Sequence, residues 1–164
     1  MLSNGGREPS LRALADRVGV SPMALYRYFP SKAALMAAVA DAGFRSLHER
    51  LEAADRSSVS VDEALVAQGM AYISFALSEP SLFRLMFSDG LAETSGYAWR
   101  DETYALLARR VAVLAQGDRQ DATLACWAVV HGLAMLQLSS SLSTERGEIR
   151  QALEVIVQAL QPNI

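Results

Sequence analysis

The chain has 164 residues, of which 51% are hydrophobic and 20% are charged, so it can bury a core and does not have the composition of a disordered protein. Its net charge of −3 is unevenly distributed. Residues 1–36 carry five basic and two acidic residues, whereas residues 57–164 carry seven basic and twelve acidic residues. A basic head on an acidic body suits a protein that contacts phosphates with one end, although such asymmetry also arises by chance.

The single cysteine, Cys126, excludes a disulfide within the chain, and one cysteine with two distant histidines offers no metal site. We therefore expect no cofactor and a reducing, cytoplasmic compartment. The N-terminal residues MLSNGGREPS lack the apolar segment of a signal peptide. The most apolar stretch, Leu124 to Leu138, is shorter than the roughly 20 residues of a membrane span. These features predict a soluble protein with no membrane partner.

Helical periodicity dominates the chain, and no segment has the alternation typical of a strand. Apolar residues at three- and four-residue spacing predict a short helix over residues 10–18, which Gly19 ends. Ser21 and Pro22 supply an N-cap and a first-turn proline for a second helix. This helix ends near Phe29, because the proline that follows disfavours helical geometry in the residue before it.

Ser31 is expected to cap a long helix that runs to about Ala54, followed by a linker over residues 55–60. The residues at 60–63 form an S-x-x-E capping box, which predicts a further helix to about Ser78. The remaining predicted elements are a short helix over 81–87, a loop over 88–96, and helices over about 97–115, 120–141 and 145–161.

Residues 11–29, LRALADRVGVSPMALYRYF, have the pattern of a helix-turn-helix, whose second helix enters the major groove of DNA. The small side chain of Ala15 allows the two helices to cross closely, and the glycine between them allows a sharp turn. Val18, Val20 and Leu25 are expected to fill the wedge between the helices. The free N–H groups at the start of the second helix would face phosphate.

With the flanking segment YRYFPSKAAL, this pattern resembles the TetR (tetracycline-repressor-like) family, in which an aromatic helix end precedes a Pro/Ser-Lys step and a long connecting helix. Downstream, Trp127, His131 and Gly132 resemble the subgroup marked by a Trp-x-x-x-His-Gly motif. The resemblance implies an all-α homodimer with a DNA-binding module and its connecting helix over 1–54, and an effector-binding and dimerisation domain over 55–164. It implies a transcriptional regulator, with release of a repressor by a small-molecule effector as the expected mode.

The resemblance also implies which residues carry these functions. Those expected to contact operator DNA lie on or just after the second helix: Ser21, Met23, Ala24, Tyr26, Arg27, Tyr28 and Lys32. The first three would face base edges or nearby backbone, and Tyr26 and Lys32 would hold phosphates. Arg27 and Tyr28 are placed where either contact is possible.

Large, adaptable side chains of the second domain are expected to line the effector pocket, with ordinary core packing as the alternative for each: Met70, Phe75, Phe83, Met86, Phe87, Trp99, Tyr104 and Met135. The last two helices carry a stripe that is either core of one chain or a four-helix dimer interface: Leu124, Trp127, His131, Leu136, Ile149, Leu153 and Ile156. A structural or interface role is expected for the lone histidine of this stripe.

One departure from the family concerns the start of the chain. The family's DNA-binding module normally begins with a full helix that covers both helices of the motif, and MLSNGGREP is too short and too polar to supply it. Either the start codon is misplaced or the chain is a natural truncation, and in a truncated chain Leu14, Val18, Leu25 and Phe29 would lose part of their cover. The alternative function is then a dimeric helical ligand-binding protein that has lost DNA binding. An enzyme is less favoured, because no acid, base and nucleophile converge.

Overall fold

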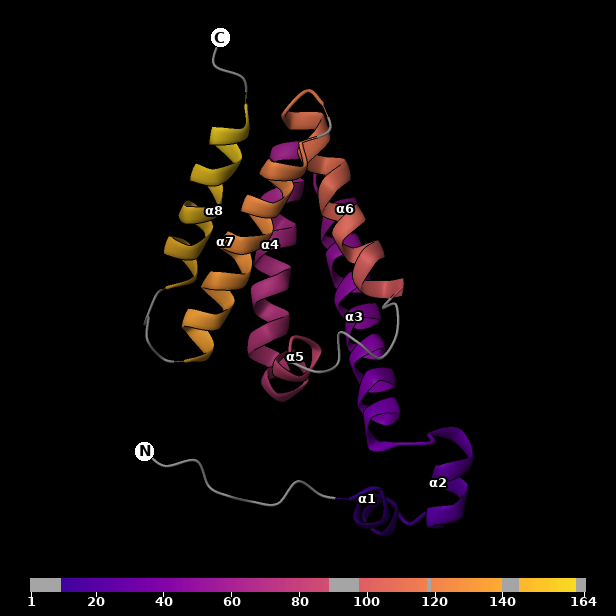
Figure 1. Cartoon of the computed structure of the whole chain (residues 1–164). Coiled ribbons are helices and arrows are strands. Elements are labelled where there is room, and N and C mark those ends of the chain that lie inside the picture. The colour runs from indigo at the N-terminus through magenta and orange to yellow at the C-terminus, as the bar shows by residue number, and fades with distance from the viewer. Residues whose placement is uncertain (1–9, 89–97, 118, 140–144, 162–164) are drawn as a thin grey trace.

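The computed structural model describes residues 10–88, 98–117, 119–139 and 145–161, which form eight α-helices and no strand (Figure 1). The predicted all-α fold is confirmed. The expected absence of a first helix before Leu11 and most of the expected loop over 88–96 lie outside the described residues. In chain order the helices are α1 (Leu11–Val18), α2 (Pro22–Tyr28), α3 (Lys32–Arg56), α4 (Val61–Ser78), α5 (Pro80–Met86), α6 (Ala98–Leu114), α7 (Gln120–Leu138) and α8 (Arg146–Leu160).

Local chemistry sets the boundaries of α1 and α2, as the sequence predicts. Gly19 ends α1 with a φ of +73°, a left-handed conformation that glycine adopts at little cost. The Ser21 hydroxyl oxygen accepts a hydrogen bond from the Ala24 amide at 3.1 Å, and Pro22 occupies the first turn of α2. Phe29 is extended and ends α2. The turn between the helices is therefore fixed by its own residues.

The connecting helix α3 runs two residues further than its predicted end at Ala54. Asp55 therefore lies in the last turn of α3 and not in a linker. Its side chain is buried and paired with Arg110 of α6, a contact that holds this turn against the body. The helix starts as expected at Ser31, whose hydroxyl oxygen accepts from the amide three residues later at 3.1 Å.

The start of α4 agrees with the predicted capping box in one of its two hydrogen bonds. The Ser60 hydroxyl oxygen accepts from the Glu63 amide at 3.1 Å. The Glu63 carboxylate accepts from the amide of Val59 at 3.1 Å, so this second bond closes one residue earlier than predicted. Both bonds satisfy amides near the helix start that have no partner within the helix.

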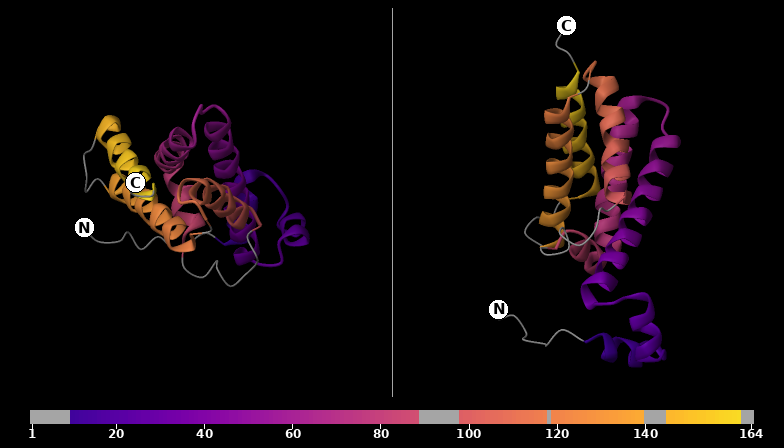
Figure 2. Two further views of the ribbon diagram at one scale, coloured as in Figure 1. Left: turned by 90° about the horizontal axis from the view of Figure 1, so that it is seen from above. Right: turned by 45° about the vertical axis from the view of Figure 1, so that its right-hand side comes forward.

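Helix α4 is the centre of the body and packs against α3, α5, α6, α7 and α8 (Figure 2). It is apolar on all sides, which is typical of a helix that neighbours surround. At Gly69 the approach of α8 is so close that a Cβ atom would lie 2.8 Å from Cδ1 of Leu153. This arrangement puts the middle of α4 at the junction of the helix layers.

The helices α1 and α2 lie at one end of α3, apart from the bundle (Figure 1). The main buried core extends from Ala40 of α3 to Val157 of α8, and the buried residues of α1, Leu11 and Ala15, lie outside it. We call α1 and α2 the head and α4–α8 the body. Helix α3 thus contacts the body along most of its length and carries the head at its N-terminal end.

Helix α7 is apolar along its length but little of it is buried. By length and composition alone it is the one described helix that could cross a membrane, whereas the sequence suggested that its apolar stretch was too short. Only Thr123, Val130 and Ala134 of α7 are fully buried. Leu124 and Leu136 are 55% and 44% exposed. An apolar helix surface that is open to solvent in a single chain is typical of an interaction surface.

Candidate DNA-binding surface and effector cavity

Helix α2 presents an exposed surface along its whole length, since none of its residues is buried. Its large side chains are unusually open: Met23 is 80% exposed, Tyr28 73% and Tyr26 50%. Ala24 and Arg27 are exposed as well. A helix that stands out in this way can enter a major groove, and its methyl and aromatic groups suit contacts with thymine methyls and the backbone.

Two predicted DNA contacts, Ser21 and Lys32, lie where helices begin. The Ser21 hydroxyl already caps α2, so it reaches DNA only from the cap position. Lys32 is the first residue of α3 and is half-buried. Both lie at helix N-termini, where backbone N–H groups and the positive end of the helix dipole attract phosphate. The geometry therefore brings the predicted DNA-binding residues together along α2 and the start of α3.

The packing between α1 and α2 differs from the predicted wedge. Ala15 is fully buried where the helices cross, as expected, and Leu25 is half-buried. Val18 and Val20, however, are 70% and 43% exposed. Val18 lies in the last turn of α1, beyond the crossing point, and no described element covers it. The prediction that these two valines fill the wedge was wrong.

The body contains a cavity of about 70 Å³. Helices α3, α4, α6, α7 and α8 each contribute to its walls, which are mainly apolar. The lining residues are Leu51, Leu65, Gln68, Gly69, Tyr72, Thr103, Tyr104, Leu107, Cys126, Trp127, Val129, Val130, Leu153, Ile156 and Val157. An apolar cavity with a few polar groups is the usual form of a small-molecule site.

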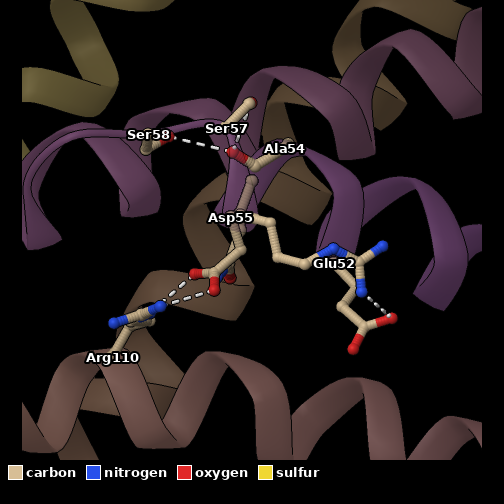
Figure 3. Close-up of polar contacts among 8 residues, drawn as sticks. Glu52, Ala54, Asp55, Ser57, Ser58 and Arg110 are labelled. Atoms are coloured by element: carbon tan, nitrogen blue, oxygen red, sulfur yellow. Dashed lines mark hydrogen bonds and ion pairs between the residues drawn. The ribbon is translucent and has the colours of Figure 1, made fainter.

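A buried polar network joins three helices next to this cavity. Arg110 of α6 donates from Nε and Nη2 to the two oxygens of Asp55, at 2.6 and 2.5 Å (Figure 3). Gln68 of α4 donates from Nε2 to Oδ1 of the same carboxylate at 2.7 Å. The Arg110 hydrogen bonds hold the pKa of Asp55 below its ordinary value, so the carboxylate is charged at neutral pH.

His131 has a structural environment at the side of the cavity. Its Nδ1 lies 2.9 Å from the hydroxyl of Tyr72, and its ring packs against Phe83 and Phe87, with centroids 5.5 and 4.6 Å away. Burial lowers the pKa of His131 and raises the pKa of Tyr72. Both groups are therefore neutral near pH 7. The geometry fits the structural role that the sequence favoured for this histidine.

The side chains predicted to line an effector pocket are mostly elsewhere. Of the eight, Tyr104 alone lines the cavity. Phe75 and Phe83 are fully buried in the core, and Met135 is 41% exposed on the opposite side of α7 from the core. The others pack as follows: Met70 borders a separate groove between α4 and α8, Met86 is buried beside Gly43, Phe87 contacts His131, and Trp99 contacts His48. Core packing, the stated alternative, accounts for most of them.

The stripe predicted for dimerisation divides into three groups. Ile149 and Leu153 of α8 are buried in the core of the same chain, because α8 packs against α4. Trp127 and Ile156 line the cavity, and His131 is half-buried beside it. The stripe's two exposed leucines remain, Leu124 and Leu136 of α7. The buried members of the stripe are therefore covered by packing within one chain.

Two polar residues that the sequence did not single out, Gln68 in the cavity wall and its partner Asp55, stand in unusual sequence positions. Gln68 is a polar residue in an otherwise apolar helix, and Asp55 sits where a solvated linker was expected. A buried side-chain amide needs hydrogen-bond partners, so a glutamine in an apolar helix is a sign of a polar network around it. Among the described residues, no group of three His, Cys, Asp or Glu side chains is placed to hold a metal ion.

An exposed helix-turn-helix at the end of a long helix, joined to an all-α body, is the architecture of a DNA-binding transcriptional regulator. Two family models match the chain: the tetracyclin repressor-like C-terminal domain over residues 65–160, and the bacterial regulatory proteins of the tetR family over residues 3–39. The chain therefore belongs to the TetR family of DNA-binding transcriptional regulators.

Individual relatives are more distant. The nucleoid occlusion factor SlmA of Marinomonas sp. is 33% identical over 90 residues, which make up 55% of this chain and 46% of that protein. The chain thus spans about half the length of the curated relatives it matches. A protein of unknown function from Rhodococcus sp. RHA1 has a TM-score of 0.81 at 28% identity, covering 98% of this chain and 89% of its own.

A second solved structure agrees in fold. A bacterial regulatory protein of the tetR family from Rhodococcus RHA1 has a TM-score of 0.74 at 18% identity, over 95% of this chain and 88% of its own. At that identity the similarity concerns the fold alone.

Proposed function

We propose that the chain is a cytoplasmic, homodimeric repressor whose binding to operator DNA is released by a small-molecule effector. The observation that carries this proposal is that no residue of α2 is buried and that Met23, Tyr26 and Tyr28 are exposed, on a head held at the end of α3. The DNA-binding module would be residues 1–54, and residues 55–164 would bind the effector and dimerise. The cavity of the body is the place where an effector would act.

The proposed mechanism is a shift between two conformations of the dimer. In the DNA-binding state, two recognition helices would lie about 34–36 Å apart, which places them in successive major grooves. Helix α3 joins the head to the body through contacts with α4, α5 and α6. A ligand that prefers a body conformation with a different α3 position would spoil that spacing, to the extent of its differential affinity for the two states.

A mobility-shift assay on the protein's own upstream intergenic DNA tests the function, with the chain as printed and with any in-frame upstream extension. We expect a specific complex with a dimer on two half-sites. Failure of both forms to bind, with the body folded and dimeric, would favour the alternative of a helical ligand-binding protein that does not bind DNA.

Lys32→Ala tests the phosphate contact. Because the proposed dimer loses one phosphate contact in each subunit, the slope of log K against log salt should become shallower by about 1.8. Affinity should fall by a similar factor on specific and nonspecific DNA, because phosphate contacts carry no sequence information. Fluorescence anisotropy at several salt concentrations measures both quantities.

Arg56→Ala is the matched control, since Arg56 lies at the opposite end of α3 and pairs with Glu52 on the surface. Its slope should equal that of the unchanged protein. An unchanged slope for Lys32→Ala would remove this residue from the proposed phosphate contacts.

The dimer interface is proposed on the exposed side of α7. Ala125, Ala128 and Gly132 follow one another at three- and four-residue spacing, with Met135 and Leu136 one turn further, so they lie along one side of the helix. Beyond the backbone of α7 itself, no described residue lies within 4 Å of a Cβ atom placed at Gly132. A second copy of α7 could approach closely along this stripe of small residues, and this would cover the apolar surface that α7 exposes.

Gly132→Leu should therefore weaken dimerisation without unfolding the chain. The leucine has open space within one chain, and it removes a glycine that costs a helix about 1 kcal/mol. Across a close interface the extra volume should cost about 1–3 kcal/mol or more, which raises the dimer dissociation constant about ten-fold or more. Sedimentation velocity over a concentration series measures the constant.

Gly117→Leu is the control, because a Cβ there also meets nothing within 4 Å but the residue lies beyond the end of α6. Equal dissociation constants for the two variants would move the interface away from Gly132.

A further inference from the structure

Among the described residues, one buried polar atom of the cavity wall, Oε1 of Gln68, has no hydrogen-bond partner. Gln68 is 3% exposed and lines the cavity wall from the middle of α4. Its Nε2 donates to Asp55, but its Oε1 is buried and has no hydrogen-bond partner among the described residues. A buried acceptor without a donor is uncommon in folded proteins, and it identifies a position where a partner would be stabilised.

The orientation of this amide is determined by its neighbours. Asp55 accepts from Gln68 Nε2 and from both donors of Arg110, so its oxygens require N–H groups. Rotation of the amide would bring Oε1 against the carboxylate, where two acceptors would repel each other. The carboxylate therefore holds Nε2, and Oε1 is the end of the amide left for another donor.

Two hydroxyls of the cavity wall, those of Tyr72 and Thr103, are already engaged in hydrogen bonds. The Tyr72 hydroxyl contacts Nδ1 of His131 at 2.9 Å, and the Thr103 hydroxyl donates to the Trp99 carbonyl at 2.6 Å. The remaining wall is mainly aliphatic and aromatic carbon. An ordered buried water typically makes about three hydrogen bonds, and such a wall offers it few partners. A mainly apolar molecule with one donor meets both the wall and the acceptor.

We propose that this cavity binds a small, neutral, mainly apolar molecule that donates one O–H or N–H hydrogen bond to Oε1 of Gln68. The inference rests on the proposed effector function and specifies the chemistry of the effector's buried end. An anion would face the Gln68 oxygen and the nearby charge of Asp55, and a cation would lose its hydration to an apolar wall. A neutral alcohol or phenol supplies the donor that Oε1 lacks and an apolar part that suits the wall.

The network also connects this position to α3. Gln68 lies on α4, and the carboxylate that it donates to belongs to the last turn of α3. A ligand on Oε1 would therefore be one side chain away from the helix that carries the head. Polarisation of the amide by the carboxylate should strengthen Oε1 as an acceptor.

The probes follow from the size of the cavity. At about 70 Å³ it is about half as large as a 150 Å³ cavity that holds benzene, so the buried end of the ligand has few atoms. 1-Butanol and methyl propyl ether are isomers of nearly equal shape, and only the alcohol can donate a hydrogen bond. Titration of the full-length protein with each compound, followed by NMR shifts of methyl groups and of the Gln68 side-chain amide, gives two dissociation constants.

We expect 1-butanol to bind about five-fold more tightly than the ether, which is the usual effect of one neutral hydrogen bond, and to shift the Gln68 amide resonances. In Gln68→Leu the preference should disappear. Tyr104→Phe is the control, since it removes a cavity hydroxyl and leaves Oε1 in place, so its preference should persist. The amide shifts of the unchanged protein test the same contact if Gln68→Leu fails to fold.

Equal binding of the two isomers would overturn the proposed contact, as would a preference that survives in Gln68→Leu, and no binding of either would overturn the cavity as the site. None of these measurements contains DNA, so they stand apart from the proposed repressor function. The proposed repressor function would be contradicted if the protein did not bind operator DNA, whatever the result of the two titrations.

Discussion

Asp55→Ala is expected to lower the free energy of unfolding by about 3 kcal/mol, the largest stability change predicted for a single side chain of this protein. Removing one partner of a buried ion pair typically costs about 3–5 kcal/mol, and the lower end applies here because Arg110 is a third exposed and can reach water. The substitution also leaves Nε2 of Gln68 without its acceptor. Urea unfolding followed by circular dichroism measures the change.

The chain contains a matched control for this prediction. Arg119 donates to both oxygens of Asp121 at 3.0 and 2.9 Å, in the same two-bond geometry, but both side chains are more than half exposed. Exposed pairs contribute about 0–1 kcal/mol, so Asp121→Ala should change stability by less than 1 kcal/mol. If the two substitutions had equal effects, burial would not be what makes the Asp55 pair strong.

The same pair predicts how stability depends on pH. Hydrogen bonds from Arg110 lower the pKa of Asp55 in the folded state below that of the unfolded chain. A carboxyl group of this kind stabilises the fold above its unfolded pKa of about 4, and that contribution is lost as the pH falls through the lower, folded pKa. The difference in unfolding free energy between the unchanged protein and Asp55→Ala should therefore shrink below about pH 4.

The parts of the fold set by local chemistry could be predicted from the sequence. Serine caps at Ser21 and Ser31, the glycine turn at Gly19 and the proline after Phe29 each act within a few residues, so their effect is visible in the printed order of residues. They are the features that distinguish a helix-turn-helix from other short helices. The exposure of α2 follows from the same pattern.

The cavity could not be predicted in this way, because its walls depend on how distant helices pack. Phe83 and Tyr104 are both large aromatic residues at helical spacing, yet one is fully buried in the core and the other lines the cavity. Residue type does not distinguish these outcomes. Asp55 and Arg110 are 55 residues apart, and their pairing becomes apparent only when α3 and α6 lie side by side.

The exposed valines of the head show a case in which apolar spacing along the sequence predicted burial that the structure does not have. Val18 follows the apolar spacing of α1, which predicted that it packs between the helices. With eight residues, α1 is little more than two turns long, so a residue in its last turn extends past the crossing with α2. Periodicity identifies the side of a helix that an apolar residue occupies, but the place where the two helices cross decides whether that residue is covered.

Gly19→Val is expected to reduce operator affinity about 30-fold to 1,000-fold while the body keeps its stability. Gly19 has a φ of +73°, and a Cβ there would have no described residue within 4 Å, so the expected effect comes from the backbone conformation and not from a clash. A left-handed conformation costs residues other than glycine about 1–2 kcal/mol each, and more for a branched side chain. This cost arises once in each subunit of the proposed dimer, about 2–4 kcal/mol in all.

Gly19→Asn separates this explanation from a general effect of adding a side chain. Asparagine adopts the left-handed conformation far more readily than valine does, so its affinity should stay within about five-fold of the unchanged protein. Both variants should keep the thermal unfolding midpoint of the body, because Gly19 lies outside the main core. If Gly19→Val bound operator DNA as tightly as the unchanged protein, residue 19 would not be left-handed in the DNA complex. Other contacts would then have to set the angle at which α2 is presented.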